Sequence, residues 1–197
     1  MQMQIKRITI LLILAVLFAH SEYSNAQVSN VSDYKVTIKG TSTMHDWESN
    51  VEELESHATY KLKGDELVSI GDASLKVTVT SIKSTKGKIM DNKTYKAFDS
   101  ENHPFIIFTL KSEKINPSKL TVDLIGTLEM AGTTLPVKLV ANYKVLANGE
   151  LEIIGTKKVK MSEYKMTAPK AMMGTIKVGD EVDINFDVTF SGSPSIL

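Results

Sequence analysis

The sequence predicts an all-β protein with about eight antiparallel strands, and three observations lead to this fold class. Apolar and polar residues alternate along most of the chain after residue 27, which is typical of strands with one buried face. Turn-forming residues separate these runs at regular intervals. Helical patterns do not alternate with the strands, so we expect a sandwich or a barrel rather than a parallel sheet.

Residues 1–26 have the three parts of a secretory signal peptide. A positively charged start is followed by an apolar run from Ile8 to Ala19, and the small residue Ala26 precedes the expected cleavage site. The run is shorter than the ~20 residues that span a bilayer, and an uncleaved anchor is the alternative. We therefore expect a periplasmic or secreted protein in which residues 27–197 form one domain.

Alternating runs divide this domain into strands joined by short turns. The runs lie near residues 33–43, 46–52, 57–63, 67–82, 104–114, 119–131, 135–147, 151–162 and 180–190. One of the early runs is expected to be a bent continuation of its neighbour. The turns KGDE (63–66), NPSK (116–119), ANGE (147–150) and VGDE (178–181) carry the Gly, Asn, Pro or Asp residues that reverse hairpins.

The alternation also assigns each strand an apolar face that should line the interior. Successive side chains of a strand point to opposite faces, so every second residue belongs to the same face. The predicted interior includes Leu120, Leu124, Leu128, Met130, Leu139, Tyr143, Ile184 and Phe186. Thr127 and Glu129 should face outward.

A polar, lysine-rich segment between residues 83 and 100 breaks the alternation. Asp91 is placed to cap a short helix near residues 91–99, and Met90, Tyr95 and Phe98 approximate one face of that helix. A lone helix in a β protein commonly plugs or flanks an opening. A solvated connector is the alternative interpretation.

Composition excludes several function classes. The formal net charge is +0 and the chain contains no cysteine, so we expect neither disulfides nor thiolate chemistry. Lysines and acidic residues are interspersed without a basic block or an aromatic–basic stripe, so nucleic acid is not an expected partner. After the first 26 residues, no segment is long and apolar enough to predict a membrane-spanning helix.

The histidines do not form a recognisable catalytic set. His45 and Asp46 are neighbours, and adjacent strand residues face opposite sides, which argues against a catalytic pair. A reaction that uses His45 with a carboxylate in the lumen is the remaining enzymatic alternative. His103 precedes Pro104, which favours extended backbone, so we interpret the two residues as the start of a strand. No serine has a G-x-S-x-G setting, and we expect no enzymatic activity.

Four methionines gather near the C-terminus: Met161, Met166, Met172 and Met173. Thioethers are suitable ligands for Cu(I). Methionine also fills irregular apolar gaps, and no H-x-H or H-E-x-x-H spacing accompanies the cluster. We therefore favour a packing role and expect no metal.

Three stretches of sequence, taken in order, carry a family resemblance. The stretch GTLEMAGTTLPV has motif residues at Gly126, Leu128, Gly132, Thr134, Pro136 and Val137. Upstream, MDNKTYKAFDSENHPFIIFTLKS places Pro104, Ile106 and Phe108 at a second landmark, and SEYKM followed by GTIKVGDEVDINFDV forms the third. Together they resemble the YceI-like polyisoprenoid-binding family. The early GTSTMHDWE resembles a secreted subgroup of the Bacteroidetes type.

The resemblance extends from about Tyr34 to Phe190, with two departures. Met90-Asp91 stands where many members have Arg-Asp, and Met161-Ser162 stands where Asp-Arg precedes the late aromatic residue. A head-group contact that depends on those arginines is therefore not carried over to this chain.

The resemblance implies an eight-stranded, lipocalin-like antiparallel barrel that holds a long apolar chain, and a barrel of about this size can hold one small ligand. The implied ligand is an isoprenoid quinone, a polyprenyl phosphate or a related lipid. We expect no cofactor, and a homodimer is one assembly that we consider. With the alternation, the expected lumen or mouth residues are Trp47, Tyr95, Phe98, Phe108, Leu124, Leu128, Met130, Leu139, Tyr143, Met166, Ile184 and Phe186. The alternative is a non-catalytic sandwich or barrel that binds a partner and has a side-chain-filled core.

Overall fold

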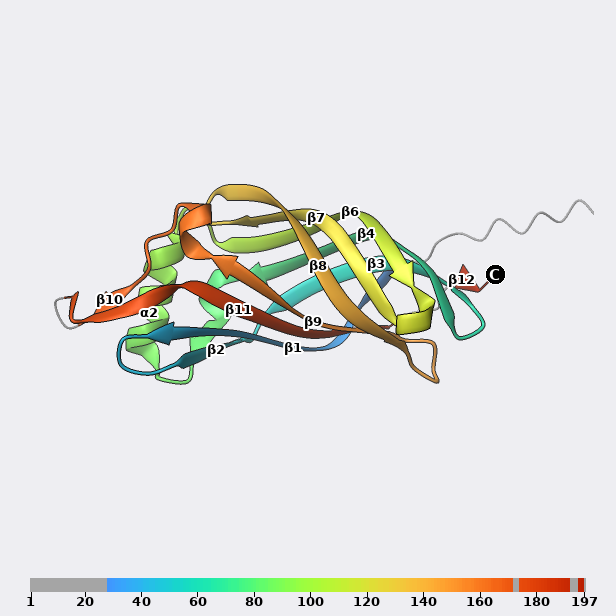
Figure 1. Cartoon of the computed structure of the whole chain (residues 1–197), viewed down its shortest axis with the longest axis horizontal. Helices are drawn as coiled ribbons and strands as arrows, with labels where there is room; N and C mark the ends of the chain where they lie inside the picture. Colours follow the sequence, from blue (N-terminus) through green and yellow to red (C-terminus); the bar gives the residue numbers. More distant parts are fainter. Residues whose placement is uncertain (1–27, 172–173, 192–194, 197) are drawn as a thin grey trace, which may run out of the picture.

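The computed structural model describes residues 28–171, 174–191 and 195–196 of the 197-residue chain. The predicted signal peptide, Met172 and Met173 lie outside these residues. The described chain forms one sheet that closes on itself, with a single α-helix at one end (Figure 1). The sheet is antiparallel except where Ser195–Ile196 pair in parallel with Lys61–Leu62. The helices in this part of the chain are all too short or too polar to span a bilayer.

The elements follow the predicted order. The strands are β1 (Val28–Ser42), β2 (Trp47–Val51), β3 (Leu54–Lys63), β4 (Glu66–Thr78), β5 (Ile82–Ser84), β6 (Phe105–Asn116), β7 (Thr121–Met130), β8 (Thr133–Val145), β9 (Leu151–Lys160), β10 (Lys170–Ala171), β11 (Ile176–Ser191) and β12 (Ser195–Ile196). The helices are α2 (Lys88–Phe98) and three 3₁₀ turns, η1 (Val79–Ser81), η2 (Pro117–Lys119) and η3 (Met161–Tyr164).

Eight strands form the closed ring, in the order β1, β3, β4, β6, β7, β8, β9 and β11. The ring closes because β11 pairs with β1 from Asn30↔Ser191 to Ser42↔Val178. This confirms the predicted all-β, eight-stranded antiparallel barrel and excludes the sandwich.

The strands β2 and β3 follow one another along the same edge of β1. Trp47–Asn50 of β2 pair with one half of β1, and His57–Thr59 of β3 pair with its first residues. The bend predicted between two early runs therefore lies between β2 and β3, which continue one another along β1. Beyond the bend, β2 pairs with the short β5, which leads into α2.

Large side chains fill the end of the barrel that lies farthest from α2. Tyr60, Leu67, Leu151 and Val122 are almost completely buried there. The Tyr60 hydroxyl donates a hydrogen bond to the Gly149 carbonyl (2.9 Å) in the β8–β9 loop, and burial raises the pKa of this hydroxyl above its ordinary value. At this end the interior is a packed core, as the filled-core alternative expects.

Two local predictions are wrong. Leu120 was assigned to the interior, but it is 55 % exposed and has a left-handed backbone (φ 52°) because it ends the 3₁₀ turn η2. Asp91 was assigned as the helix cap, but α2 starts earlier, with Gly87 at the N-cap. The Asp91 carboxylate instead accepts a hydrogen bond from the Ser84 amide (2.6 Å), which ties α2 to β5.

Gly126 occupies an inward position of β7 where the facing strand comes very close. A Cβ at this position would lie 2.2 Å from the Thr109 carbonyl oxygen and 2.9 Å from the Phe108 ring. The partner strand β6 has a register shift between Leu110 and Ser112, beside this contact. The close approach therefore requires glycine.

We predict that Gly126→Ala lowers the free energy of unfolding by roughly 1–3 kcal/mol, because a methyl group would collide with backbone that cannot move independently. Gly71→Ala is the control, since its Cβ would meet only the Thr59 hydroxyl at 3.2 Å. Chemical denaturation of both variants measures the difference. Equal losses of stability would contradict the backbone clash.

Candidate functional site

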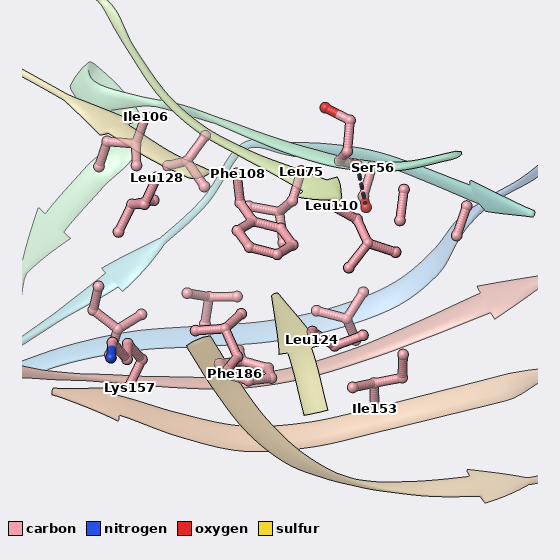
Figure 2. A pocket seen from close by; sticks show the side chains of 18 of the residues that line it. Ser56, Leu75, Ile106, Phe108, Leu110, Leu124, Leu128, Ile153, Lys157 and Phe186 are labelled. Carbon is pink, nitrogen blue, oxygen red and sulfur yellow. Dashed lines mark hydrogen bonds between the residues drawn. The ribbon is translucent and has the colours of Figure 1, made fainter. Parts of the chain in front are cut away.

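The barrel interior contains an apolar cavity of ≈ 140 Å³ between its packed end and α2. Inward side chains from every strand of the ring line it, and Figure 2 shows many of them. The lining includes Phe108, Leu124, Leu128, Leu139, Ile184 and Phe186, all of which were predicted from the alternation or the resemblance. Ile70 belongs to both the lining and the packed core, so the packed end forms the floor of the cavity.

Among the residues that the structure describes, three polar ones border this cavity: Ser56, Ser74 and Lys157. The Ser56 hydroxyl donates a hydrogen bond to the Ser74 carbonyl (2.8 Å), so its polar group is satisfied within the wall. The Lys157 ammonium donates to the Lys138 carbonyl (3.2 Å). A molecule in the cavity would therefore meet hydrocarbon almost everywhere.

A second, smaller cavity of ≈ 70 Å³ lies beneath α2. Trp47, Phe98, Met130 and Met166 line it, together with Met90 and Ala97 of the helix. The two cavities share Ile38, Ile106 and Ile184 as lining residues. These three isoleucines therefore separate two compartments of one apolar interior.

Polar contacts hold α2 over the second cavity. Lys93 donates a hydrogen bond to the Lys170 carbonyl (2.8 Å), which connects the helix to β10. Tyr95 donates to the Thr80 carbonyl (2.7 Å) and accepts from Lys83 (2.8 Å). Two roles were predicted for this segment: a helix that plugs or flanks an opening, or a solvated connector. The structure shows the first, because α2 covers an apolar compartment.

Two predicted lining residues border neither cavity, and their assignment needs correction. Tyr95 points to the η1 side of α2, where its hydroxyl makes the contacts described above. Tyr143 faces inward but lies at the packed end, where its amide donates to the Leu120 carbonyl (2.9 Å). The alternation identified the correct face for Tyr143 but contains no information about its depth along the barrel.

Lys157 is the lining residue whose significance the sequence analysis missed. It follows the inward residues Leu151, Ile153 and Gly155 of β9 at intervals of two, and Val159 continues the same face. A lysine in that register interrupts an otherwise apolar face. This interruption was visible in the sequence.

The three histidines of the described chain, His45, His57 and His103, border neither cavity. His45 belongs to the exposed β1–β2 loop rather than to a strand, and its Nδ1 lies 3.1 Å from the backbone oxygen of Asp46, not from the carboxylate. His103 directly precedes Pro104, and β6 starts at Phe105, which confirms the predicted strand start. The His103 ring also packs against the Gly132 backbone in the β7–β8 turn.

The two methionines of the C-terminal group that the structure describes, Met161 and Met166, have a packing environment. Met161 and Met166 are buried and border the second cavity. Within the described residues, no group of three or more His, Cys, Asp or Glu side chains is arranged to hold a metal ion.

The sequence of the chain matches a family model described as the YceI-like domain over residues 19–190. The chain belongs to the YceI-like family. No curated protein matches the sequence.

Solved structures of similar shape support the same fold. BcnA of Burkholderia cenocepacia superposes with a TM-score of 0.64 at 17 % identity, over 80 % of this chain and 96 % of that one. A polyisoprenoid-binding domain from Saccharophagus degradans, implicated in plant cell wall breakdown, gives a TM-score of 0.63 at 12 % identity, over 86 % and 100 %. The YCEI protein of Campylobacter jejuni gives 0.53 at 17 % identity, over 89 % and 91 %.

The structure explains part of the YceI-like signature in this chain. Gly126 permits the close approach of β6, and Gly132 has the positive φ (72°) that the β7–β8 turn requires. Pro136 lies in a part of β8 that has no ladder pair with β9. Because proline has no N–H to donate, it fits a strand edge without a partner.

We predict that xenon under pressure occupies the main cavity, because a dry apolar cavity of about this size binds such probes. Leu139→Phe adds inward volume and should reduce xenon occupancy, whereas Val140→Phe, at a position that is 56 % exposed, should not. Diffraction from xenon-pressurised crystals measures the occupancy. Absence of xenon from wild-type crystals would contradict an accessible apolar cavity at this position.

Proposed function

We propose that the protein is a periplasmic or secreted binding protein that holds an isoprenoid or similar long-chain lipid inside the barrel. The observation that carries this proposal is the apolar lining shared by two adjoining compartments. The family assignment supports it, as does the likeness to a domain described as polyisoprenoid-binding. The predicted signal peptide supports the proposed location.

The size of the interior sets a requirement on binding. The main cavity, at ≈ 140 Å³, is small beside the ~300–1,000 Å³ of typical ligand pockets, so only a short part of a lipid chain fits it while the side chains stay in place. A longer chain must therefore displace Ile38, Ile106 and Ile184 and enter the compartment beneath α2. Binding in this protein includes a rearrangement of these side chains.

Hydrophobic burial can drive that rearrangement when the chain contains several isoprenoid units. Each buried methylene contributes roughly 0.8 kcal/mol, so a five-carbon unit contributes about 4 kcal/mol. Association costs roughly 4–15 kcal/mol, before the side chains move. Chains of several units are therefore the proposed ligands.

The alternative function is a non-catalytic partner-binding protein with a filled interior. Two observations favour it: the packed end around Tyr60, and a main cavity smaller than the ~300–1,000 Å³ of typical ligand pockets. We propose a non-catalytic role in either case, because His45, His57 and His103 border neither apolar cavity.

We predict that Leu128→Lys removes a copurifying lipid, because an ammonium group inside the cavity must lose its hydration against hydrocarbon, at a cost of several kcal/mol. Thr127→Lys is the matched control, since the neighbouring side chain faces outward on the same strand. Organic extraction of the purified, folded proteins followed by mass spectrometry measures the lipid.

The same pair of variants distinguishes the two functions. A lipid carrier should yield a long-chain lipid from the wild type and from Thr127→Lys. A filled-core protein should yield no lipid from the wild type, and Leu128→Lys should then act only by unfolding the barrel. Wild-type protein that carries no lipid and takes up no added prenyl chain contradicts the carrier proposal.

A further inference from the structure

Lys157 is the only ionisable side chain that lines the main cavity in the described part of the chain. Figure 2 shows it beside Phe186 at the margin of the lining side chains. Long lysine side chains can place an apolar stem along hydrocarbon and keep the ammonium group at a polar boundary.

The boundary is a gap in the ladder between two neighbouring strands of the ring. β8 and β9 pair only where Ala141–Val145 face Leu151–Gly155. Beyond Gly155, the described residues show no ladder pair between these strands, and Figure 1 shows them separating toward the α2 end. We call this gap, between residues 133–140 of β8 and 156–160 of β9, the seam.

Side chains occupy the seam where backbone pairing stops. The Lys157 ammonium crosses it and donates to the Lys138 carbonyl (3.2 Å), an oxygen on the β8 edge that faces β9. Next to it, Gly155 has no side chain, and the Phe186 ring lies where a Cβ would be (2.5 Å). The wall at this level therefore depends on side chains that can move rather than on a backbone ladder.

The Lys157 ammonium has unused binding capacity. A lysine has three N–H donors, and one is accounted for by the Lys138 carbonyl. On the strands that flank the seam, β7 and β11, two carboxylates have other lysine partners: Asp123 pairs with Lys138 (2.7 Å) and Glu181 with Lys158 (2.8 Å). Within the described residues, no carboxylate lies within ion-pair distance of Lys157.

We propose that Lys157 binds the anionic head group of a lipid whose chain lies in the cavity, and that the head group occupies the seam. This inference rests on the proposed lipid-binding function and adds the chemical class of the ligand: a long apolar chain that ends in a phosphate or a carboxylate. The ammonium exchanges its backbone carbonyl for a charged acceptor, and charge-assisted hydrogen bonds are the stronger kind. The stem of Lys157 remains part of the apolar wall.

Three ligands with one chain and different head groups test the proposal: farnesyl phosphate, farnesoic acid and farnesol. Each is titrated calorimetrically into the wild-type protein and into Lys157→Met, Lys157→Arg and Lys158→Met. Lys158→Met is the matched control, because it removes the same charge from the adjacent residue, whose side chain pairs with Glu181 and Asp183 outside the barrel. Circular dichroism confirms that each variant is folded.

We expect Lys157→Met to weaken binding of both anionic ligands at least about tenfold, the usual effect of losing a hydrogen bond to a charged group. Farnesol binding should change by less than about threefold, since methionine retains an apolar stem. Lys157→Arg and Lys158→Met should keep the preference for the anionic ligands. A loss confined to farnesyl phosphate identifies phosphate as the head group, and a loss confined to farnesoic acid identifies carboxylate.

Two results would overturn the proposal while the lipid-binding function stands. One is Lys157→Met binding the anionic ligands as tightly as the wild type does. The other is an equal loss for all three ligands, which would mean that Lys157 only shapes the wall. The control has its own reading: loss of the anionic preference in Lys158→Met as well would assign the effect to general charge and not to Lys157. If the wild type binds none of the three ligands, the proposed function fails, and this inference fails with it.

Discussion

The closed ladder of backbone hydrogen bonds is the constraint on which the rest of the structure depends. Each strand of the ring pairs with two neighbours, and the β1–β11 pairing closes the ring. At the seam, where β8 and β9 do not pair, the Lys157 ammonium donates to the free Lys138 carbonyl instead. The backbone therefore presents little polarity to the inside, and side chains alone decide the character of the interior. An almost wholly apolar lining is stable only because the wall satisfies its own polar groups.

The interior is divided unequally along the barrel. Tyr60 and Leu151 fill one end, where the Tyr60 hydroxyl also anchors the β8–β9 loop. Toward α2 the strands β8 and β9 diverge, and the contacts between helix and strands leave unfilled space. The packed end supplies the hydrophobic core that a domain of this size needs for stability. Because this core stabilises the barrel, the end near α2 can contain unfilled space.

The sequence predicted the features that depend on local pattern. The alternation assigned Leu124, Leu128 and Phe186 to the interior, and Pro104 marked the start of a strand, because each depends on a few neighbouring residues. Prediction from local pattern failed where contacts with distant parts of the chain determine the structure. Asp91 binds the Ser84 amide rather than capping the helix, and the depth of Tyr143 follows from the packing of the whole end. The role of Lys157 depends on where β8 leaves β9, which no local pattern records.

The pairing of β1 with β11 has a consequence for the order of events during folding. A chain that emerges N-terminus first presents Val28–Ser42 early, but the partner of this strand comes almost last. Until then, β1 has a free edge and an apolar face, and contacts so distant in sequence form slowly. The ring therefore cannot close until β11 has been synthesised. A nascent chain interrupted before β11 would remain an open, aggregation-prone sheet rather than most of a barrel.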